Sequence, residues 1–409
     1  MAYLPIDEYG VIGDLNTVAL VARNGSIDFM CFPDFDSPSV FARLLDDQKG
    51  GYFQIEPVSG NRRVNQIYLS DTNVLFTRFL FQDGVAELSD FMPVEEDRVV
   101  PNVVRRVKAV RGDIQFRMVC HPAFDYGRAD HSVELEDGQA LFTSQGQDGL
   151  VLRLRSDVPL RVKDGAVEAR FTLEQGKTAA FILEEVLPDY TSPCDVPGYV
   201  SESFKNTVNF WHDWIEGSEY DGRWQNMVNR SALTLKLLTS QVHGSMVAAP
   251  TFGLPEVVGG ERNWDYRFSW VRDSAFMVYA FIRLGFTEEA EAYLDWIREC
   301  SAEQMEDGSM ALMYAMDGGE VMEEQTLDHL EGYRGSSPVR IGNQAHEQLQ
   351  LDIYGELMDS VYLIDKYGAP ISYEMWQHLH KIVDYVRQHW DQPDEGIWDE
   401  RGARRHLLF

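Results

Sequence analysis

One stretch of the chain, residues 259–273 with the sequence GGERNWDYRFSWVRD, gathers arginine, aspartate and aromatic side chains just before a run of apolar residues. Arginine presents a planar fork of hydrogen-bond donors, aspartate accepts hydrogen bonds from two hydroxyls, and tryptophan or tyrosine offers a flat apolar face. This set of side chains suits a polar, ring-shaped ligand. An ion-pair cluster that caps a buried helix would use the same residue types, so this stretch alone leaves both interpretations open.

Two further segments, residues 323–343 and 394–402, also place carboxylates, arginine and an aromatic residue in a loop. Two carboxylates that flank a bond, together with aromatic platforms and hydroxyl-binding groups, are the residues that glycoside hydrolysis requires. In so acidic a chain, each cluster taken alone is also typical of a solvated loop. The repetition of the same residue types in three loops favours a shared site.

The composition excludes several classes of function. A formal net charge of −30 repels nucleic acid and anionic membrane surfaces. The chain has no phosphate-binding glycine motif and no apolar run long enough to span a membrane, and the residue types at its N-terminus lead us to expect no signal sequence. The four cysteines lie far apart, and His378 and His380 diverge on a helix, so no metal site is predicted. These features indicate a cytoplasmic enzyme or binding protein.

The loops require elements that position them, and the pattern of the chain changes near its middle. At 409 residues, two domains are expected. Residues 1–190 alternate short β-rich runs with turn dipeptides such as Asn24-Gly25, which predicts an antiparallel β-sandwich. Three prolines in residues 188–198 mark a boundary. A linker with one helix, residues 191–222, follows, and we expect that helix to lie against both domains.

Residues 223–409 read as helices joined by long loops. Helices are predicted from Arg223 to Leu238, after Asp273, from Thr287, from Asn343 to Tyr367 and from Ser372 to near Trp390. Helical hairpins with functional loops at one end favour an α/α barrel, although a plain helical bundle fits the same periodicity.

Three motifs, RNWDYRFSWVRDSAF, LEGYRGSSPVRIGN and EGIWDERGARRH, resemble glycoside hydrolase family 15, which contains glucoamylases, trehalases and glucodextranases. The sequence GSIDFMCFPDFDSPSVFARLL, residues 25–45, resembles the bacterial and archaeal two-domain branch of that family. The resemblance covers essentially the whole chain. It implies an N-terminal β-sandwich, a linker helix and a six-hairpin α/α barrel. It also implies inverting hydrolysis of α-glucosidic bonds in oligosaccharides or trehalose, without a cofactor.

Carried over to this sequence, the resemblance assigns substrate-binding residues. Arg272 and Asp273 match the pair that grips the non-reducing glucose, and Trp270 belongs to the same motif. Arg340 and Asn343 match the second loop and are expected to face the same pocket. The convergence of the three loops predicts one pocket, lined by Trp264, Trp270, Arg272, Asp273, Arg340 and Trp398.

The catalytic positions depart from the family pattern. Where the family has a glutamate as general acid, this chain has Asp399, followed by Glu400. An aspartate carboxyl stops about 1.5 Å short of a glutamate carboxyl, and the neighbouring side chain points in a different direction. The family's general base lies further downstream, in the second half of the barrel, and no residue here matches it. We therefore expect a truncated barrel that hydrolyses maltose or trehalose negligibly by itself.

Two classes of function remain open. The first is an inverting hydrolase of α-glucosides. The second is a non-catalytic sugar-binding or interaction protein on a degenerate or truncated barrel, which Asp399 and the unassigned base favour. In both classes of function, the expected binding partner is an α-glucoside oligosaccharide or trehalose. Bare apolar helix faces would favour a homo-oligomer.

Overall fold

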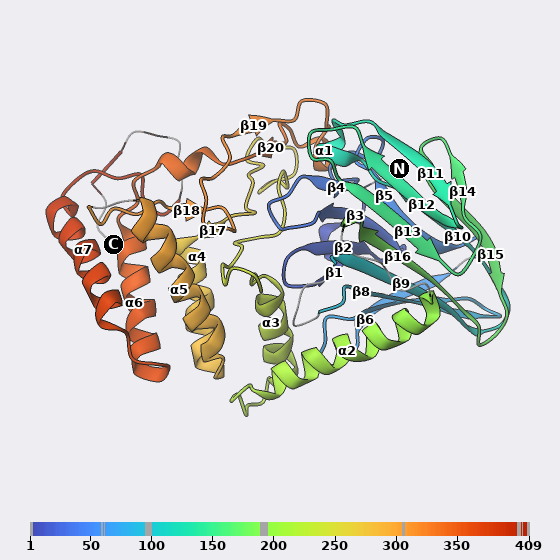
Figure 1. The fold of residues 1–409 in the computed structure, drawn as a ribbon, viewed down its shortest axis with the longest axis horizontal. Helices are drawn as coiled ribbons and strands as arrows, with labels where there is room; N and C mark the ends of the chain where they lie inside the picture. The colour runs from blue at the N-terminus through green and yellow to red at the C-terminus, as the bar shows by residue number, and fades with distance from the viewer. Residues whose placement is uncertain are drawn as a thin grey trace. The chain divides into compact units, whose positions relative to one another are not determined.

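The chain forms two compact units in a computed structural model, which describes residues 3–58, 60, 62–94, 100–188, 195–304, 307–398, 402 and 404–406. The first unit contains Met1–Glu216 together with Leu330–Gly335 (Figure 1). The second contains Gly217–His329 and Ser336–Phe409. A short segment of the C-terminal half therefore belongs to the first unit.

The first unit consists of two eight-stranded antiparallel sheets. The first sheet has the order β1-β2-β3-β5-β10-β15-β14, with β4 paired to β3, and its strands are β1 (Tyr9–Gly13), β2 (Val18–Ala22), β3 (Ser26–Cys31), β4 (Ser39–Phe41), β5 (Tyr52–Pro57), β10 (Ile114–His121), β14 (Arg161–Lys163) and β15 (Ala166–Leu173). The second sheet has the order β11-β12-β13-β16-β9-β8-β7-β6, and its strands are β6 (Arg63–Tyr68), β7 (Leu75–Leu80), β8 (Val85–Phe91), β9 (Asn102–Arg111), β11 (His131–Glu136), β12 (Gln139–Ser144), β13 (Val151–Ser156) and β16 (Thr178–Glu185). The short helical turns of the first unit are η1 (Ile6–Glu8), α1 (Phe124–Gly127) and η2 (Tyr333–Gly335).

One apolar core joins the two sheets. Phe53 and Phe116 from the first sheet and Leu88 and Phe181 from the second are completely buried in the same cluster. The predicted turn at Asn24-Gly25 forms between β2 and β3. Gly25 has a φ of 84°, and a side chain there would meet the carbonyl oxygen of Ile55, so the position requires glycine. The predicted β-sandwich is thereby confirmed.

A buried ion pair also joins the sheets. Arg105 of β9 and Asp90 of β8 have fully buried side chains, and Arg105 Nε donates to Asp90 Oδ1 over 2.8 Å. The guanidinium also donates to the backbone oxygens of Phe53, in β5 of the other sheet, and of Gly25, in the turn between β2 and β3. Burial raises the pKa of the Asp90 carboxyl, and the charge of Arg105 opposes that shift.

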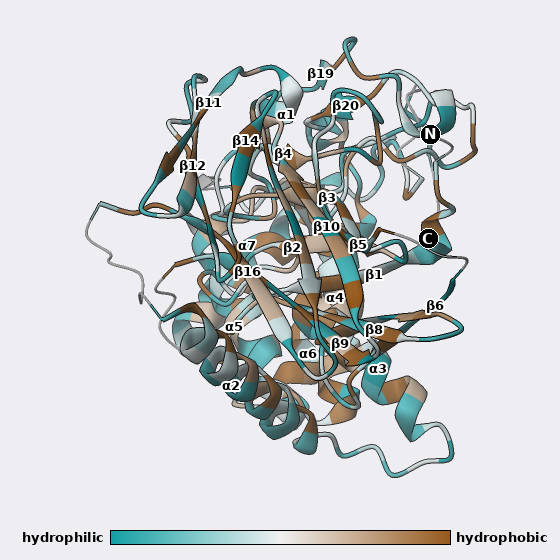
Figure 2. Cartoon of the chain, turned by 90° about the vertical axis from the view of Figure 1, so that its right-hand side faces the viewer, coloured by the Kyte–Doolittle hydropathy of each residue, from teal (hydrophilic) through white to brown (hydrophobic). Residues whose placement is uncertain are grey.

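The expected linker helix is α2 (Val196–Glu216), and its contacts place it in the first unit. Its residues Val196 and Val200 pack into a cluster with Ile182 of β16. The Phe204 ring lies edge-on to Phe91 at 5.5 Å, and such pairs stabilise packing beyond the area they bury. Hydrophilic residues cover much of the side of α2 that faces the viewer in Figure 2. An amphipathic helix against a sheet accounts for the periodic apolar residues of this segment.

The second unit is mainly helical. Its helices are α3 (Gln225–Leu237), α4 (Val271–Leu284), α5 (Thr287–Gln304), η3 (Gln344–Glu347), α6 (Asp352–Tyr367) and α7 (Tyr373–His389). Two-residue strands form the pairs β17 (Ser269–Trp270) with β18 (Met313–Tyr314) and β19 (Gln325–Thr326) with β20 (Arg340–Ile341). The helices α4 to α7 lie side by side (Figure 1). In the described part of the chain, no helix is both long and apolar enough to cross a membrane.

The helix predicted to begin at Asn343 begins instead at Asp352. The amide nitrogens of Leu349 and Leu351 donate to the carboxylates of Glu395 and Asp394, over 2.9 and 3.1 Å. These long-range hydrogen bonds hold the segment before α6 in a non-helical path. The prediction was wrong here because a tertiary contact overrides the local helical periodicity.

Candidate functional site

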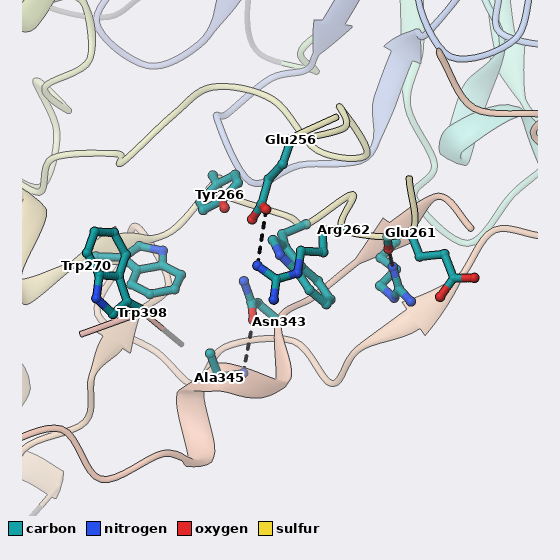
Figure 3. Close-up of a pocket in the computed structure, with 10 residues that line it drawn as sticks. Glu256, Glu261, Arg262, Tyr266, Trp270, Asn343, Ala345 and Trp398 are labelled. Carbon is teal, nitrogen blue, oxygen red and sulfur yellow. Dashed lines mark hydrogen bonds and ion pairs between the residues drawn. The ribbon is translucent and has the colours of Figure 1, made fainter. Parts of the chain in front are cut away.

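The second unit contains a pocket of about 280 Å³ (Figure 3). Residues from all three loops that the sequence singled out contribute to its lining. The lining residues are Glu256, Glu261, Arg262, Trp264, Tyr266, Trp270, Arg340, Asn343, Ala345 and Trp398. Of the predicted residues, Trp264, Trp270, Arg340, Asn343 and Trp398 therefore lie together, whereas Arg272 and Asp273 are not among the lining residues.

The first wall comes from an extended segment before α4, whose side chains alternate in direction. Trp264 and Tyr266 line the pocket, whereas Asp265 between them and Arg267 after Tyr266 are completely buried. Asp265 accepts two hydrogen bonds from the Arg267 guanidinium, over 2.9 and 2.7 Å, and a third from the amide nitrogen of Gly342 over 3.0 Å. The buried ion pair therefore fixes the pocket-facing residues and ties them to the second loop.

Arg340 forms a second wall with the indole of Trp264. Its guanidinium carbon lies 4.8 Å from the centre of the Trp264 ring. Its Nη1 donates to the backbone oxygen of Glu261 over 2.6 Å, and its Nε lies 3.3 Å from a carboxylate oxygen of Glu324. The arginine is thus stacked on an aromatic face and oriented from two sides, a geometry that suits its planar group.

Asn343 is a buried connector at the same wall. Its Oδ1 accepts from the amide nitrogen of Ala345, and its Nδ2 donates to the backbone oxygen of Asp265, each over 3.0 Å. Because both ends of the side-chain amide are engaged, Asn343 shapes the pocket by holding η3 against the first wall.

Arg272 and Asp273 occupy the first turn of α4, directly after the pocket residue Trp270. Arg272 Nη1 donates to Gln350 over 2.7 Å and to the carboxylate of Asp352, the first residue of α6, over 2.9 Å. Asp273 reaches solvent, yet desolvation by the surrounding protein raises the pKa of its carboxyl, and the charge of Arg272 opposes that shift. Arg272 therefore joins the starts of α4 and α6 beside the pocket wall.

Trp398 lines the pocket with an indole that is 78% exposed. The loop that carries it is closed at its base, where Asp394 and Arg405 exchange two backbone hydrogen bonds of 2.8 Å. Asp399 and Glu400, the predicted catalytic residues, follow Trp398 directly but lie outside the described residues. Within the described residues, no group of three or more His, Cys, Asp or Glu side chains could hold a metal ion.

Several lining residues were missed by sequence reasoning. Tyr266 had a signal, because it alternates with Trp264 along the extended segment, and its ring lies 6.1 Å from that of Trp270. Glu256 precedes the motif and had no local signal. It reaches the pocket through an exposed ion pair of 3.4 Å with Arg262, drawn as a dashed line in Figure 3.

Aromatic faces, an oriented arginine and carboxylates therefore surround one small concavity. Such a site can bind a ligand whose apolar C–H faces pack against the aromatic rings of the protein and whose hydroxyls bond to its polar side chains. A compact, uncharged and polyhydroxylated ligand fits this combination.

Comparisons with known proteins agree with this chemistry. The model of the Glycosyl hydrolases family 15 matches residues 222–407, and that of the Trehalase-like, N-terminal domain matches residues 2–174. A trehalase of Thermoplasma volcanium is 35% identical over 412 residues, which cover 100% of this chain and 64% of that protein. Trehalase 1 of Sulfolobus acidocaldarius is 34% identical over 411 residues, which cover 97% of this chain and 67% of that protein. The chain thus spans about two thirds of the length of these relatives.

Among solved structures, a bacterial glucoamylase complexed with acarbose superposes with a TM-score of 0.64 at 12% sequence identity. The match covers 95% of this chain and 59% of the glucoamylase chain, so the two share a fold. This likeness confirms the predicted combination of an N-terminal sandwich with the helical region of an α/α barrel. Together with the family model and the identity to trehalases along the whole chain, it shows that the chain belongs to glycosyl hydrolase family 15.

Proposed function

We propose that this protein hydrolyses α-glucosidic bonds and that trehalose is its substrate. The observation that carries the proposal is the pocket in which three loops join, with the Arg340 guanidinium stacked on Trp264. The names of the relatives, which are trehalases, support trehalose over longer glucose oligosaccharides. They also favour an enzyme over a non-catalytic sugar-binding protein.

The dimensions of the pocket support the binding of a single sugar ring. Its volume of about 280 Å³ is slightly below the range of about 300–1,000 Å³ that is usual for drug-sized ligands. One glucose unit of trehalose would occupy it, with Trp264, Tyr266 and Trp270 against its apolar faces. The Arg340 guanidinium would donate to its hydroxyls.

The chemistry proposed for this pocket is a single displacement with inversion. A carboxylic acid protonates the oxygen that joins the two glucose units while a carboxylate removes a proton from water on the opposite face. The water oxygen bonds to the anomeric carbon, the glycosidic bond breaks, and two glucose molecules are released. We assign the acid to Asp399, with Glu400 beside it as the second candidate. No residue of this chain is assigned as the base, and we therefore expect slow turnover by these residues alone.

Trehalose binding tests the proposal independently of turnover. We expect isothermal titration calorimetry to give one trehalose site, and Trp264→Ala to weaken binding at least about tenfold, because a ring that stacks on the sugar is lost. Trp224→Ala is the matched control, since Trp224 is 56% exposed and is absent from the pocket lining. Equal affinities for the two variants, or no binding to the wild type, would overturn the proposal.

The assignment of the acid is tested by glucose release from trehalose. Asp399→Asn is compared with Asp391→Asn, an exposed aspartate a few residues earlier in the chain. Any turnover of the wild type is expected to disappear in the first variant and to persist in the second. Robust turnover that Asp399→Asn abolishes would show that a general base exists among these residues.

We also propose a cytoplasmic location and self-association. Cysteines without a disulfide spacing support the location. Exposed aromatic side chains on α6, on α7 and directly after α7, among them Tyr362, Trp376 and Trp390, support a homo-oligomer, because burying them would remove apolar area from water. Light scattering of the purified protein tests the oligomer.

A further inference from the structure

A long loop connects the pocket with the other unit of the chain. It is closed at its base, where β19 and β20 pair and the amide nitrogen of Leu327 donates to Val339 over 2.9 Å. Its tip, Leu330–Gly335, belongs to the β-sandwich unit, whereas the residues on both sides belong to the helical unit. We call the segment from Gln325 to Ile341 the strap.

The tip of the strap is held by the N-terminal segment and by one turn of the sandwich. Tyr333 is almost completely buried, its hydroxyl donates to the backbone oxygen of Leu4 over 2.9 Å, and its ring meets that of Tyr3 edge-on at 5.7 Å. The Tyr3 hydroxyl donates to the carboxylate of Glu331. The Glu331 amide donates to Asp46 Oδ2 over 3.2 Å. These contacts form one hydrogen-bonded anchor.

The backbone of the tip is also constrained. Arg334 has a φ of 54°, a left-handed conformation that non-glycine residues adopt only where their surroundings impose it. Its Nη2 donates to the backbone oxygen of Tyr3 over 3.4 Å. The conformation of the tip is therefore imposed by the anchor.

The base of the strap is fixed against the first pocket wall. The completely buried Ser336 accepts a hydrogen bond of 2.9 Å from the amide nitrogen of Gly259. The side chain of Asn263 donates to the backbone oxygen of Pro338 over 3.0 Å. Arg340 therefore lies in the pocket on a segment that hydrogen bonds hold both at its tip and at its base.

We propose that Tyr3, Tyr333 and Asp46 are positioning residues of the sugar pocket, and that the sandwich sets the place of Arg340 through the strap. The proposal rests on the proposed function only in taking a sugar as the ligand. The sandwich then has a role in ligand binding, although none of the residues that the structure describes in this unit lines the pocket. Loosening the anchor would widen the range of positions that the guanidinium occupies, and mispositioned groups bind less tightly.

Hydrogen–deuterium exchange of the full chain tests the transmission directly. Tyr333→Phe removes only the hydroxyl that donates to Leu4. We expect the amides of Leu327 and Gly342, at the base of the strap, to exchange about fivefold faster, which is the effect of one lost hydrogen bond on local opening. Tyr3→Phe, which breaks the bond to Glu331, is expected to act in the same direction. Unchanged exchange at the base in both variants would overturn the proposal.

Tyr68→Phe is the matched control. The Tyr68 hydroxyl donates to the backbone oxygen of Val11 over 2.9 Å, the same type of bond at the same length, elsewhere in the sandwich. The Tyr68→Phe substitution is expected to lower the stability of the same unit without changing any contact of the strap. Exchange at the strap base that rises equally in this control would show that the effect of Tyr333→Phe is general destabilisation, and the proposal would fail.

Trehalose binding separates positioning from folding. We expect Tyr333→Phe to raise the Kd for trehalose about fivefold, because Arg340 is held less firmly in the pocket. The stoichiometry is expected to stay unchanged, because every molecule is folded. A purely structural role would instead lower the stoichiometry at unchanged Kd, which would count against positioning. If the wild type binds no trehalose, the proposed function fails, while the exchange experiment still decides whether the anchor orders the strap.

Discussion

Asp265→Asn is expected to destabilise the helical unit strongly and to release the second pocket wall. The Asp265 carboxylate and the Arg267 guanidinium are both completely buried. The carboxylate accepts from the backbone amide, Nε and Nη2 of Arg267 and from the amide of Gly342. The substitution keeps the size of the side chain but removes its charge and replaces one acceptor by a donor.

The magnitude follows from the burial of the pair. Removing one partner of a buried ion pair leaves the other charge uncompensated, at a cost of about 3–5 kcal/mol. With a urea dependence of about 2 kcal/mol/M, the midpoint of unfolding would fall by about 1.5–2.5 M. Trehalose affinity would fall as well, because the amide of Gly342 loses the carboxylate that links it to the first wall.

Tryptophan fluorescence during urea unfolding is the suitable assay, because only Trp211 and Trp214 of the nine tryptophans belong to the sandwich unit. Glu256→Gln is the matched control. It removes a carboxylate from an exposed ion pair of 3.4 Å with Arg262, for which a loss below about 1 kcal/mol is expected. If Asp265→Asn destabilised the protein no more than this control, the buried pair would not organise the pocket as argued.

Three further predictions concern the pH dependence, the linker helix and the pocket. Because desolvation raises the pKa of the Asp273 carboxyl in the folded protein, ionising that carboxyl costs stability as the pH rises from its ordinary pKa of 3.8 through its higher native value. Asp273→Asn is therefore expected to be more stable than the wild type in urea at pH 7 and equally stable below that window, and a less stable variant at pH 7 would contradict this. Phe204→Ala is expected to lower the free energy of unfolding, followed by circular dichroism, by about 2 kcal/mol, since the ring packs on the sandwich; a loss below about 0.5 kcal/mol would refute the docking of α2. Arg340→Lys keeps the charge but loses the planar stack on Trp264, so calorimetry is expected to show about tenfold weaker trehalose binding, whereas unchanged affinity would exclude the stack from recognition.

Local patterns in the sequence determined the division of the chain into a β part and a helical part. The residues of β5 alternate between partly buried and buried, and Gly25 adopts the positive φ that its turn requires. These properties depend on near neighbours, because a strand has a period of two and a turn needs particular residue types. The three motifs also identified the family and the loops that form the pocket, since the same residue types recur at short spacing in each.

Contacts between distant residues decided what those patterns left undetermined. Asp265 and Gly342 are 77 residues apart, and Leu351 and Asp394 are 43 apart, yet each pair shares a hydrogen bond. The first contact orients the pocket walls. The second keeps the preceding residues out of a helix, so that α6 begins at Asp352 instead of Asn343. Likewise, the motif that reads as one loop divides at Gly335, with its tip in the sandwich unit and Arg340 in the pocket. No local period encodes such pairings, because their free energy is gained only after the chain has brought both partners out of water together.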